Sequence, residues 1–322
     1  MAEAPASDVG QMFAAATARY ARQIAVRVAD RQCSYQQLRA MVRNVALNMA
    51  ARGVSQQSTV ALALQRPLQA SLAVLATSLI GCRWTSYAPA ISRRPSIAPT
   101  HVISTGRLLA QDSGLPAPRV LTIDRSWLRK PDRYAHAKSF TFPGVASVDD
   151  PWLYAQSSGS TGSPKYMAMS SALVLANARR MAETELPPER LAPCLSSMFP
   201  PTTAGGLFAL LFVLERGGTM VFSSDYGDWQ DAGVDLVLGS PNHFARAIGD
   251  AAVPSSPPRM LARCVGASLS KVQLAQLLRY FDGVITAYGA TETGRVAARS
   301  LRDAEADVRC VGPALAGCAI EI

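Results

Sequence analysis

In the first 81 residues, segments whose hydrophobic positions repeat with the period of a strand alternate with segments that have the period of a helix. The pattern predicts, in chain order, the helix Val9–Ala21, the strand Ile24–Val28, the helix Ser34–Arg52, the strand Thr59–Leu64 and the helix Leu68–Ile80. Ser34 is a suitable N-cap, Pro67 a suitable first helical residue, and Gly53 and Gly81 suitable helix ends. This order is typical of a parallel sheet with helices on both faces.

The middle of the chain, Pro89–Pro151, is richer in Pro, Ser and Arg. Short strands are predicted there at His101–Ser104 and Arg119–Ile123, and Ala135–Asp150 is expected to be a linker. The second half repeats the α/β pattern, with predicted strands Leu153–Gln156, Thr219–Phe222, Val234–Leu238, Cys264–Gly266 and Gly283–Tyr288, and helices Ala172–Glu183, Gly206–Arg216 and Asn242–Ile248. A Gly/Ser loop is expected to lead from Leu153–Gln156 directly into the next helix.

Length and composition narrow the class of protein. The chain has 322 residues, of which 49% are hydrophobic and 17% charged, which excludes a disordered tail. The six cysteines contain no Cys-x-x-Cys pair, so neither a zinc site nor a disulfide framework is indicated, and a cytoplasmic location is expected. No signal peptide is predicted, and the longest apolar runs, Ser71–Cys82 and Gly205–Leu214, are too short to span a membrane.

The net charge of +9 first suggests a nucleic-acid partner. The basic residues are scattered, however, and no run of five or more occurs; the densest points are pairs such as Arg93–Arg94. We therefore expect no nucleic-acid binding, only a cationic surface that mildly attracts anionic ligands.

The segment Ser157–Lys165, with the sequence S-S-G-S-T-G-S-P-K, carries the strongest chemical signal. Its glycines allow successive N–H groups to point at one anion, its hydroxyls add donors, and Lys165 adds a positive charge. These groups suit the phosphates of a nucleotide, although the spacing differs from that of a P-loop. A flexible Ser/Gly linker is the alternative, which the preceding strand and the Pro-Lys ending disfavour.

A second segment, Ala287–Thr293, follows a predicted strand. Tyr288 offers a flat face for a purine, Gly289 allows close approach of a ligand, and Thr291 can donate to a phosphate oxygen. Glu292 offers the oxygen ligand that Mg²⁺ prefers.

Together these motifs resemble those of the adenylate-forming superfamily, which includes acyl- and aryl-CoA ligases, luciferase and the adenylation domains of peptide synthetases. Fainter matches at Ser34–Leu38, Gly266–Ser270 and Val311–Gly317 extend the resemblance over most of the chain. Tyr166 departs from it, because most members have Gly after the loop lysine.

The resemblance implies a role for each matched residue. Lys165, Thr291 and Glu292 would be catalytic, with Thr291 on the α-phosphate and Glu292 on Mg²⁺, while Tyr288 would stack on adenine. The residues implied to bind the nucleotide are Ser157, Ser158, Gly159, Ser160, Thr161, Gly162, Lys165, Gly266, Ala267, Ser268, Ala287, Tyr288, Gly289 and Thr291.

The substrate pocket is implied to involve Phe199, Pro200, Gly205, Gly239 and Gly266. Pro200 stands where many CoA ligases have His. The peptide-synthetase version of this segment carries an Asp for the substrate ammonium, but no acidic residue occurs from Ser196 to Leu214. A buried ammonium without a carboxylate is unfavourable, so an aryl or fatty acid is expected rather than an α-amino acid. Leu207 and Leu211 fit either this pocket or the helix core.

The implied fold is the α/β large domain of an adenylate-forming enzyme. It contains two α/β sheet subdomains with flanking helices and a partial small barrel-like sheet. Residues 1–322 are expected to form this N-terminal domain, subdivided near 135–150, and to end before the family's mobile C-terminal domain and its lysine. The implied reaction uses ATP and Mg²⁺ to form an acyl-adenylate from a small carboxylic acid. CoA or the phosphopantetheine of an acyl carrier protein then accepts the acyl group. Two alternatives remain open: a nucleotide-binding module without turnover, and a docking piece of a larger synthase.

Overall fold

The computed structural model describes residues 6–87, 97–106, 119–129, 131, 141–157, 165–186, 190–249, 251–290 and 293–321. The chain divides into two compact units. Unit 1 comprises 1–23, 34–176 and 200–207, and unit 2 comprises 24–33, 177–199 and 208–322. None of the described helices has the length and apolar character required to cross a bilayer.

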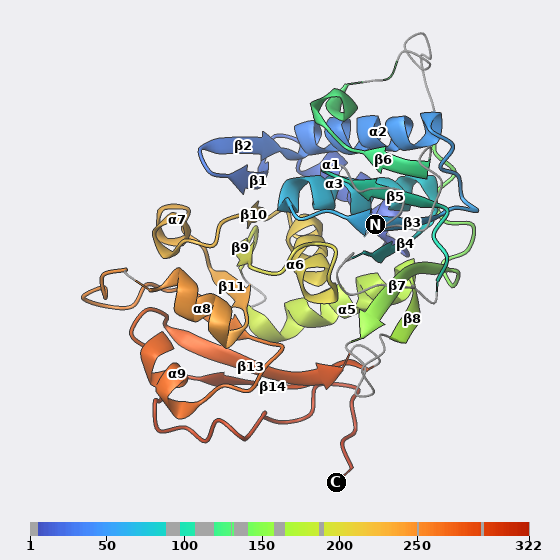
Figure 1. Ribbon diagram of the computed structural model, residues 1–322. Helices are drawn as coiled ribbons and strands as arrows, with labels where there is room; N and C mark the ends of the chain where they lie inside the picture. The colour runs from blue at the N-terminus through green and yellow to red at the C-terminus, as the bar shows by residue number, and fades with distance from the viewer. Residues whose placement is uncertain are drawn as a thin grey trace. The chain divides into compact units, whose positions relative to one another are not determined.

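Unit 1 is built on a mostly parallel sheet (Figure 1). Its strands, in spatial order, are β6 (Val120–Thr122), β5 (His101–Ser104), β3 (Thr59–Ala63), β4 (Arg83–Ser86), β7 (Pro151–Ser157) and β8 (Lys165–Ser170). Only the β7–β8 pair among them is antiparallel. The helical elements of this unit are α1 (Val9–Arg19), α2 (Tyr35–Ala51), α3 (Pro67–Ile80) and the 3₁₀ turn η2 (Arg125–Leu128).

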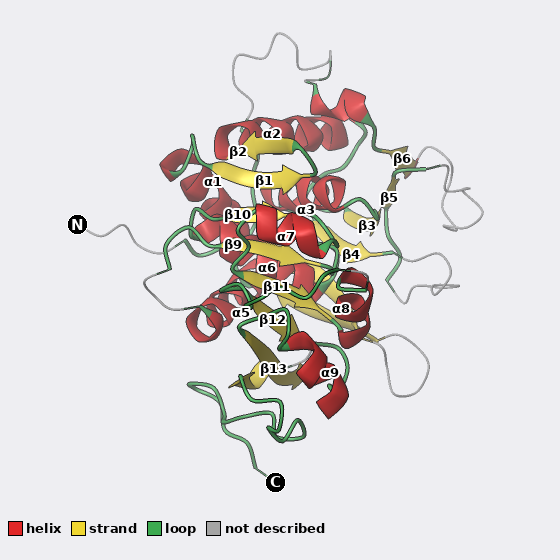
Figure 2. Ribbon diagram, turned by 90° about the vertical axis from the view of Figure 1, so that its left-hand side faces the viewer, coloured by secondary structure: helices red, strands yellow, loops and turns green. Residues whose placement is uncertain are grey.

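Unit 2 contains a second sheet, whose central strands lie side by side in Figure 2. The spatial order is β14 (Gly294–Leu301), β13 (Gly283–Ala290), β12 (Leu261–Cys264), β11 (Leu236–Gly239), β9 (Cys194–Ser197), β10 (Thr219–Val221), β1 (Ile24–Val28) and β2 (Arg31–Ser34). Its helices are α7 (Tyr226–Asp231), α8 (Pro241–Ala247) and α9 (Lys271–Leu277), while α5 (Ser171–Glu185) and α6 (Ala204–Glu215) are shared between the units.

The caps account for several of these boundaries. Ser34 and Gln37 form a reciprocal capping box at the start of α2. Pro67 opens α3, and Gly81 ends it with φ of 78°, a left-handed conformation that glycine adopts without strain.

The two parallel-rich sheets confirm the predicted fold class. Toward the end of the chain, β14 extends the sheet of unit 2, and an isolated bridge joins Ala297 and Ala314. The described residues contain no closed barrel. Part of the expected linker, residues 135–140, lies outside the described residues.

Two element predictions were wrong. The Gly/Ser loop leads into strand β8 before helix α5 begins, because Lys165–Ser170 pairs with β7. The strand predicted at Cys264–Gly266 ends at Cys264, since Gly266 has φ of 81° and turns the chain out of the sheet.

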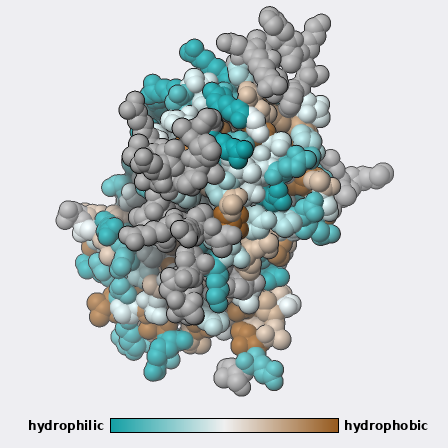
Figure 3. Space-filling model, turned by 45° about the vertical axis from the view of Figure 1, so that its right-hand side comes forward, coloured by the Kyte–Doolittle hydropathy of each residue, from teal (hydrophilic) through white to brown (hydrophobic). Residues whose placement is uncertain are grey.

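The core of unit 2 is rich in aromatic residues. Trp229, Phe244 and Phe281 are at most 1% exposed and meet at ring-centre distances between 5.4 and 6.4 Å. Burial of such large side chains supplies much of the hydrophobic stabilisation and holds the sheet under α7, α8 and α9. On the face drawn in Figure 3, hydrophilic and hydrophobic residues are interspersed, in agreement with the scattered charges of the sequence.

Candidate active site

The predicted phosphate loop begins and ends on a β-hairpin in unit 1. Ser157, at the end of β7, is the antiparallel backbone partner of Lys165, at the start of β8. The hairpin therefore brings both ends of the loop together and leaves Lys165 exposed. Ser158, Gly159, Ser160, Thr161 and Gly162 lie outside the described residues.

In unit 2, three neighbouring parallel strands have their carboxyl ends on the same side of the sheet, which forms one edge. The register aligns Gly239 of β11 with Cys264 of β12, and Cys264 with Thr286 of β13. The carboxyl ends of parallel strands are where ligands of open α/β sheets bind. This edge brings together three predicted groups, namely Gly239, Gly266–Ser268 and Ala287–Gly289.

Tyr288 lies on the exposed end of β13. The side chain is 58% exposed, which leaves a ring face accessible to a ligand. Gly289 follows at a β-bulge, and a Cβ there would lie 2.1 Å from the carbonyl oxygen of Gly294. The β13–β14 hairpin thus requires this glycine for its own backbone contact. Thr291 and Glu292 lie outside the described residues, between Ala290 and Thr293.

The turn after β12 is open to solvent. Gly266, Ala267 and Ser268 are exposed, and nothing lies within 4 Å of the position of a Cβ on Gly266. The turn is held on both sides: the Val265 N–H donates to the Gly239 carbonyl at 3.0 Å, and Ser270 caps α9.

The predicted acyl side of the site contains a contact that the sequence did not indicate. The ring of Phe199 lies edge-on to His243 of α8, with ring centres 5.1 Å apart. The Met198 N–H donates to the Leu238 carbonyl at 2.9 Å, and the Met198 side chain occupies the space in front of Gly239. His243 Nδ1 accepts the Ser240 N–H at 3.3 Å, which leaves the ring proton on Nε2 when the ring is neutral.

Pro200 and Gly205 lie in unit 1 at the entry to α6. The Pro200 carbonyl accepts the Thr203 N–H at 2.9 Å and the Thr203 hydroxyl at 2.8 Å, and Gly205 is in the first turn of the helix. Leu207 and Leu211 are fully buried, so they fit the helix core better than the substrate pocket.

Arginines beside β13 are a second feature that the sequence did not indicate. Arg295 is the β14 partner of Gly289, and its guanidinium donates to the Arg180 carbonyl at 3.1 Å. Burial, followed by the charge of Arg180, lowers the pKa of Arg295 to about 10. Arg263 is buried in β12, and desolvation lowers its pKa to about 9. Arg295 thus places a basic residue on the strand next to Gly289.

Two carboxylates of unit 2 are already engaged by arginines. Glu215 accepts hydrogen bonds from Arg179, and Asp235 accepts from Arg190 and from the Cys194 N–H. Within unit 2, neither carboxylate is available to pair with a substrate ammonium without breaking an ion pair.

Glu292, the carboxylate predicted to hold Mg²⁺, lies outside the described residues. The described residues contain no group of three His, Cys, Asp or Glu side chains able to form an all-protein metal site. Mg²⁺ is commonly bound by one or two carboxylates plus substrate phosphates and water, so a single carboxylate in the motif is enough.

Comparison with solved structures places this fold among adenylate-forming enzymes. The o-succinylbenzoate CoA synthetase MenE of Bacillus subtilis, solved with OSB-AMP, superposes with a TM-score of 0.82 at 18% identity. That match covers 97% of this chain and 65% of MenE. The N-terminal subdomain of Klebsiella oxytoca NpsA, solved with 3-hydroxybenzoyl-AMSN, matches at 0.74 and 17% identity, covering 93% of this chain and 77% of that one.

VinN, solved with 3-methylaspartate, matches with a TM-score of 0.78 at 20% identity, over 98% of this chain and 87% of that chain. No curated protein matches the sequence significantly. The fold is thus that of the adenylate-forming enzymes. The sequence model described as AMP-binding enzyme matches residues 13–322, and the chain belongs to that family.

Proposed function

We propose that this protein activates an aryl or fatty carboxylic acid with ATP, forming an acyl-adenylate and pyrophosphate. The observation that carries the proposal is the common edge of β11, β12 and β13, where Gly239, Gly266 and the exposed Tyr288 lie together. A nucleotide whose base stacks on Tyr288 would direct its phosphates along this edge toward the Thr291–Glu292 segment.

In the proposed reaction, a carboxylate oxygen of the acid attacks the α-phosphorus of ATP. A new C–O–P bond forms, the bond from the α-phosphorus to the bridging oxygen breaks, and pyrophosphate leaves with that electron pair. The task of the protein is to hold the two reactants in line and to stabilise the charge that develops on the phosphate oxygens. Thr291 would donate to the α-phosphate, and Lys165 with its loop would hold the outer phosphates.

Glu292 would hold Mg²⁺ together with phosphate oxygens, and the bound ion would offset the negative charge of the triphosphate. Arg295, on the strand next to Gly289, would add to the attraction for the nucleotide. CoA or a carrier-protein phosphopantetheine would then accept the acyl group through its thiol. None of the six cysteines forms a disulfide in the described part of the chain, which supports a reducing compartment such as the cytoplasm.

The substrate class follows from the chemistry around Phe199. Its neighbours Met198 and His243 carry no negative charge, and no acidic residue occurs from Ser196 to Leu214. An apolar acid fits this environment better than an α-amino acid. VinN, which was solved with 3-methylaspartate, is a counter-example, so the experiment must include amino acids.

Acid-dependent exchange of radiolabelled pyrophosphate into ATP tests the proposal. The assay uses benzoate and ring-substituted benzoates, octanoate, and free α-amino acids including aspartate. We expect exchange with an aryl or fatty acid above that with any amino acid; preference for an amino acid would refute the substrate class. Calorimetry with Mg-ATP distinguishes the two alternatives. Binding of Mg-ATP without exchange indicates a nucleotide-binding module without turnover. The absence of both binding and exchange indicates a docking piece of a larger synthase.

A further inference from the structure

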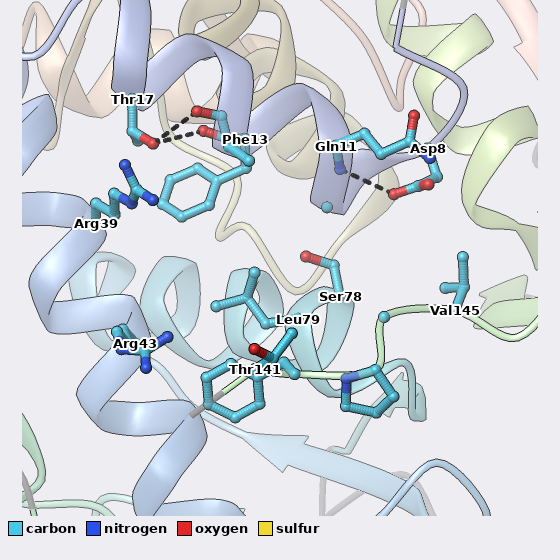
Figure 4. A pocket seen from close by; sticks show the side chains of 15 residues that line it. Asp8, Gln11, Phe13, Thr17, Arg39, Arg43, Ser78, Leu79, Thr141 and Val145 are labelled. Carbon is cyan, nitrogen blue, oxygen red and sulfur yellow. Dashed lines mark hydrogen bonds between the residues drawn. The ribbon is translucent and has the colours of Figure 1, made fainter. Parts of the chain in front are cut away.

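Unit 1 contains a cavity of about 530 Å³ that the proposed reaction does not use (Figure 4). It is lined by one face of α1, by α2, by the end of α3 and by residues 141–145. None of the lining residues belongs to the predicted active site. Its volume lies within the usual range for small-molecule pockets, about 300–1,000 Å³.

The charges on the cavity wall are separated along its length. Arg39 and Arg43 lie one turn apart on α2 and enter from the same side, whereas Asp8 and Gln11 lie across from them (Figure 4). Asp8 is buried, and its Oδ1 accepts the Gln11 N–H at 3.0 Å as the cap of α1. The end of the cavity formed by α2 therefore carries two positive charges, and the only carboxylate on the described wall is held at the other end.

Between these ends the wall is largely apolar. Phe13, Leu79, Phe142 and Pro143 all line the cavity, and the Arg43 guanidinium lies 5.6 Å from the centre of the Phe142 ring. This contact orients Arg43 and keeps its charge beside an aromatic surface.

The loop that closes this wall is fixed to the helices. The Gly144 N–H donates to the Leu79 carbonyl at 2.9 Å, and the Gln56 amide donates to the Gly144 carbonyl at 2.8 Å. The cavity is thus a formed feature of unit 1.

We infer that this cavity binds a small organic anion: a carboxylate or phosphate group joined to an aliphatic or aromatic body. The anionic group would accept hydrogen bonds from Arg39 and Arg43, whose guanidinium groups match the geometry of carboxylate and phosphate oxygens. The body would lie among Phe13, Leu79 and Pro143. This site is separate from that of the acid undergoing activation, and its ligand undergoes no chemistry there.

Titration calorimetry on the full chain tests this inference with 4-phenylbutyrate and phenyl phosphate as probes. Acetate and the neutral 4-phenylbutan-1-ol are controls that lack the body and the charge, respectively. We expect both aromatic anions to bind and both controls to bind at least about tenfold more weakly, because each lacks one half of the recognition. The better of the two probes distinguishes a carboxylate site from a phosphate site. Equal binding of the neutral alcohol would overturn the inference.

Matched variants locate the binding. Arg39→Ala and Arg43→Ala should each weaken it about tenfold or more, as expected for loss of a charge-assisted hydrogen bond, while the exposed Arg125→Ala should not. Ala14→Phe should fill the cavity and abolish binding, whereas Ala15→Phe, its neighbour outside the wall, should preserve it.

The variant Lys165→Ala distinguishes binding in this cavity from binding at the proposed active site. Binding lost in Ala14→Phe but retained in Lys165→Ala supports the cavity whether or not the chain activates acids. Binding that survives both arginine variants and Ala14→Phe would refute it.

Discussion

At the scale of single residues, Gly289 connects the stability of the β13–β14 hairpin to the proposed nucleotide site. A Cβ on this residue would lie 2.1 Å from the Gly294 oxygen and 2.8 Å from the Arg295 Cα, both backbone atoms that must move. We expect Gly289→Ala to lower the free energy of unfolding by about 1–3 kcal/mol, as overpacking does elsewhere. It should also weaken binding of Mg-ATP, because Thr291 and Glu292 follow two and three residues later.

Gly106→Ala is the matched control for that substitution. Gly106 has no positive φ and nothing within 4 Å of a Cβ position, so the change should stay within about 0.5 kcal/mol. Chemical denaturation of both variants measures the difference. Equal stability of the two would contradict the close approach of the hairpin strands.

His101 is the residue that should make stability depend on pH near neutrality. It is 8% exposed, and its Nδ1 lies 2.9 Å from the Thr100 hydroxyl. Burial, and next the charge of Arg119, lowers the pKa of His101 below its ordinary 6.5, although a hydrogen bond to the Arg52 backbone opposes the shift. The folded state therefore disfavours the protonated ring.

A lowered folded-state pKa means that the unfolded chain binds this proton more readily. The contribution of His101 is complete above pH 6.5 and is lost as the pH falls from there toward its folded pKa. Urea denaturation from pH 7.5 to 5.5 should show this loss, and His101→Gln should flatten the profile. An unchanged slope in the variant would assign the pH dependence to other groups.

At the scale of elements, the short helix α8 carries His243, which contacts Phe199 on the proposed acyl side of the site. Ser240 caps it in a reciprocal box with His243, the residue that contacts Phe199. We expect Ser240→Ala to lower stability by about 0.5–2 kcal/mol through loss of the cap. It should also weaken acid binding, because the Phe199–His243 contact loses its anchor.

Ser270→Ala provides the comparison, since Ser270 caps α9 in the same way but does not hold His243. Both variants should lose similar stability in thermal denaturation, and Ser240→Ala alone should raise the KM for the acid in pyrophosphate exchange. If both variants changed the KM for the acid equally, α8 would have no specific role in binding the acid.

The elements differ in how far the sequence predicts them. The starts of α2 and α3 follow from Ser34 and Pro67, because caps act locally. Strand β8 was not predicted, since its six residues follow a polar loop and are fixed as a strand by pairing with β7. The helices α7 and α9 were also missed, because six or seven residues give too short a periodic signal.

At the scale of the whole molecule, the motifs predict which segments carry the chemistry but not their neighbours. Tyr288 and Gly266 are recognisable because local backbone and side-chain requirements leave a pattern in the sequence. Arg295 and His243 are not recognisable, because their contacts with Arg180 and Phe199 join residues 115 and 44 positions apart. Tertiary contacts of this kind leave no periodic or motif signal.

We propose that the chain holds Mg-ATP through the Ser157–Lys165 loop and the Tyr288–Glu292 segment. Calorimetric titration with Mg-ATP of the parent, Lys165→Ala, Glu292→Ala and the control Lys271→Ala tests it most directly; Lys271 is exposed, with its only described ion pair to Glu305. We predict that Lys165→Ala and Glu292→Ala each lose about 1.5–3 kcal/mol of binding free energy, as expected for charge-assisted contacts, while Lys271→Ala matches the parent. Parent-like affinity in both site variants would contradict the assignment of this site.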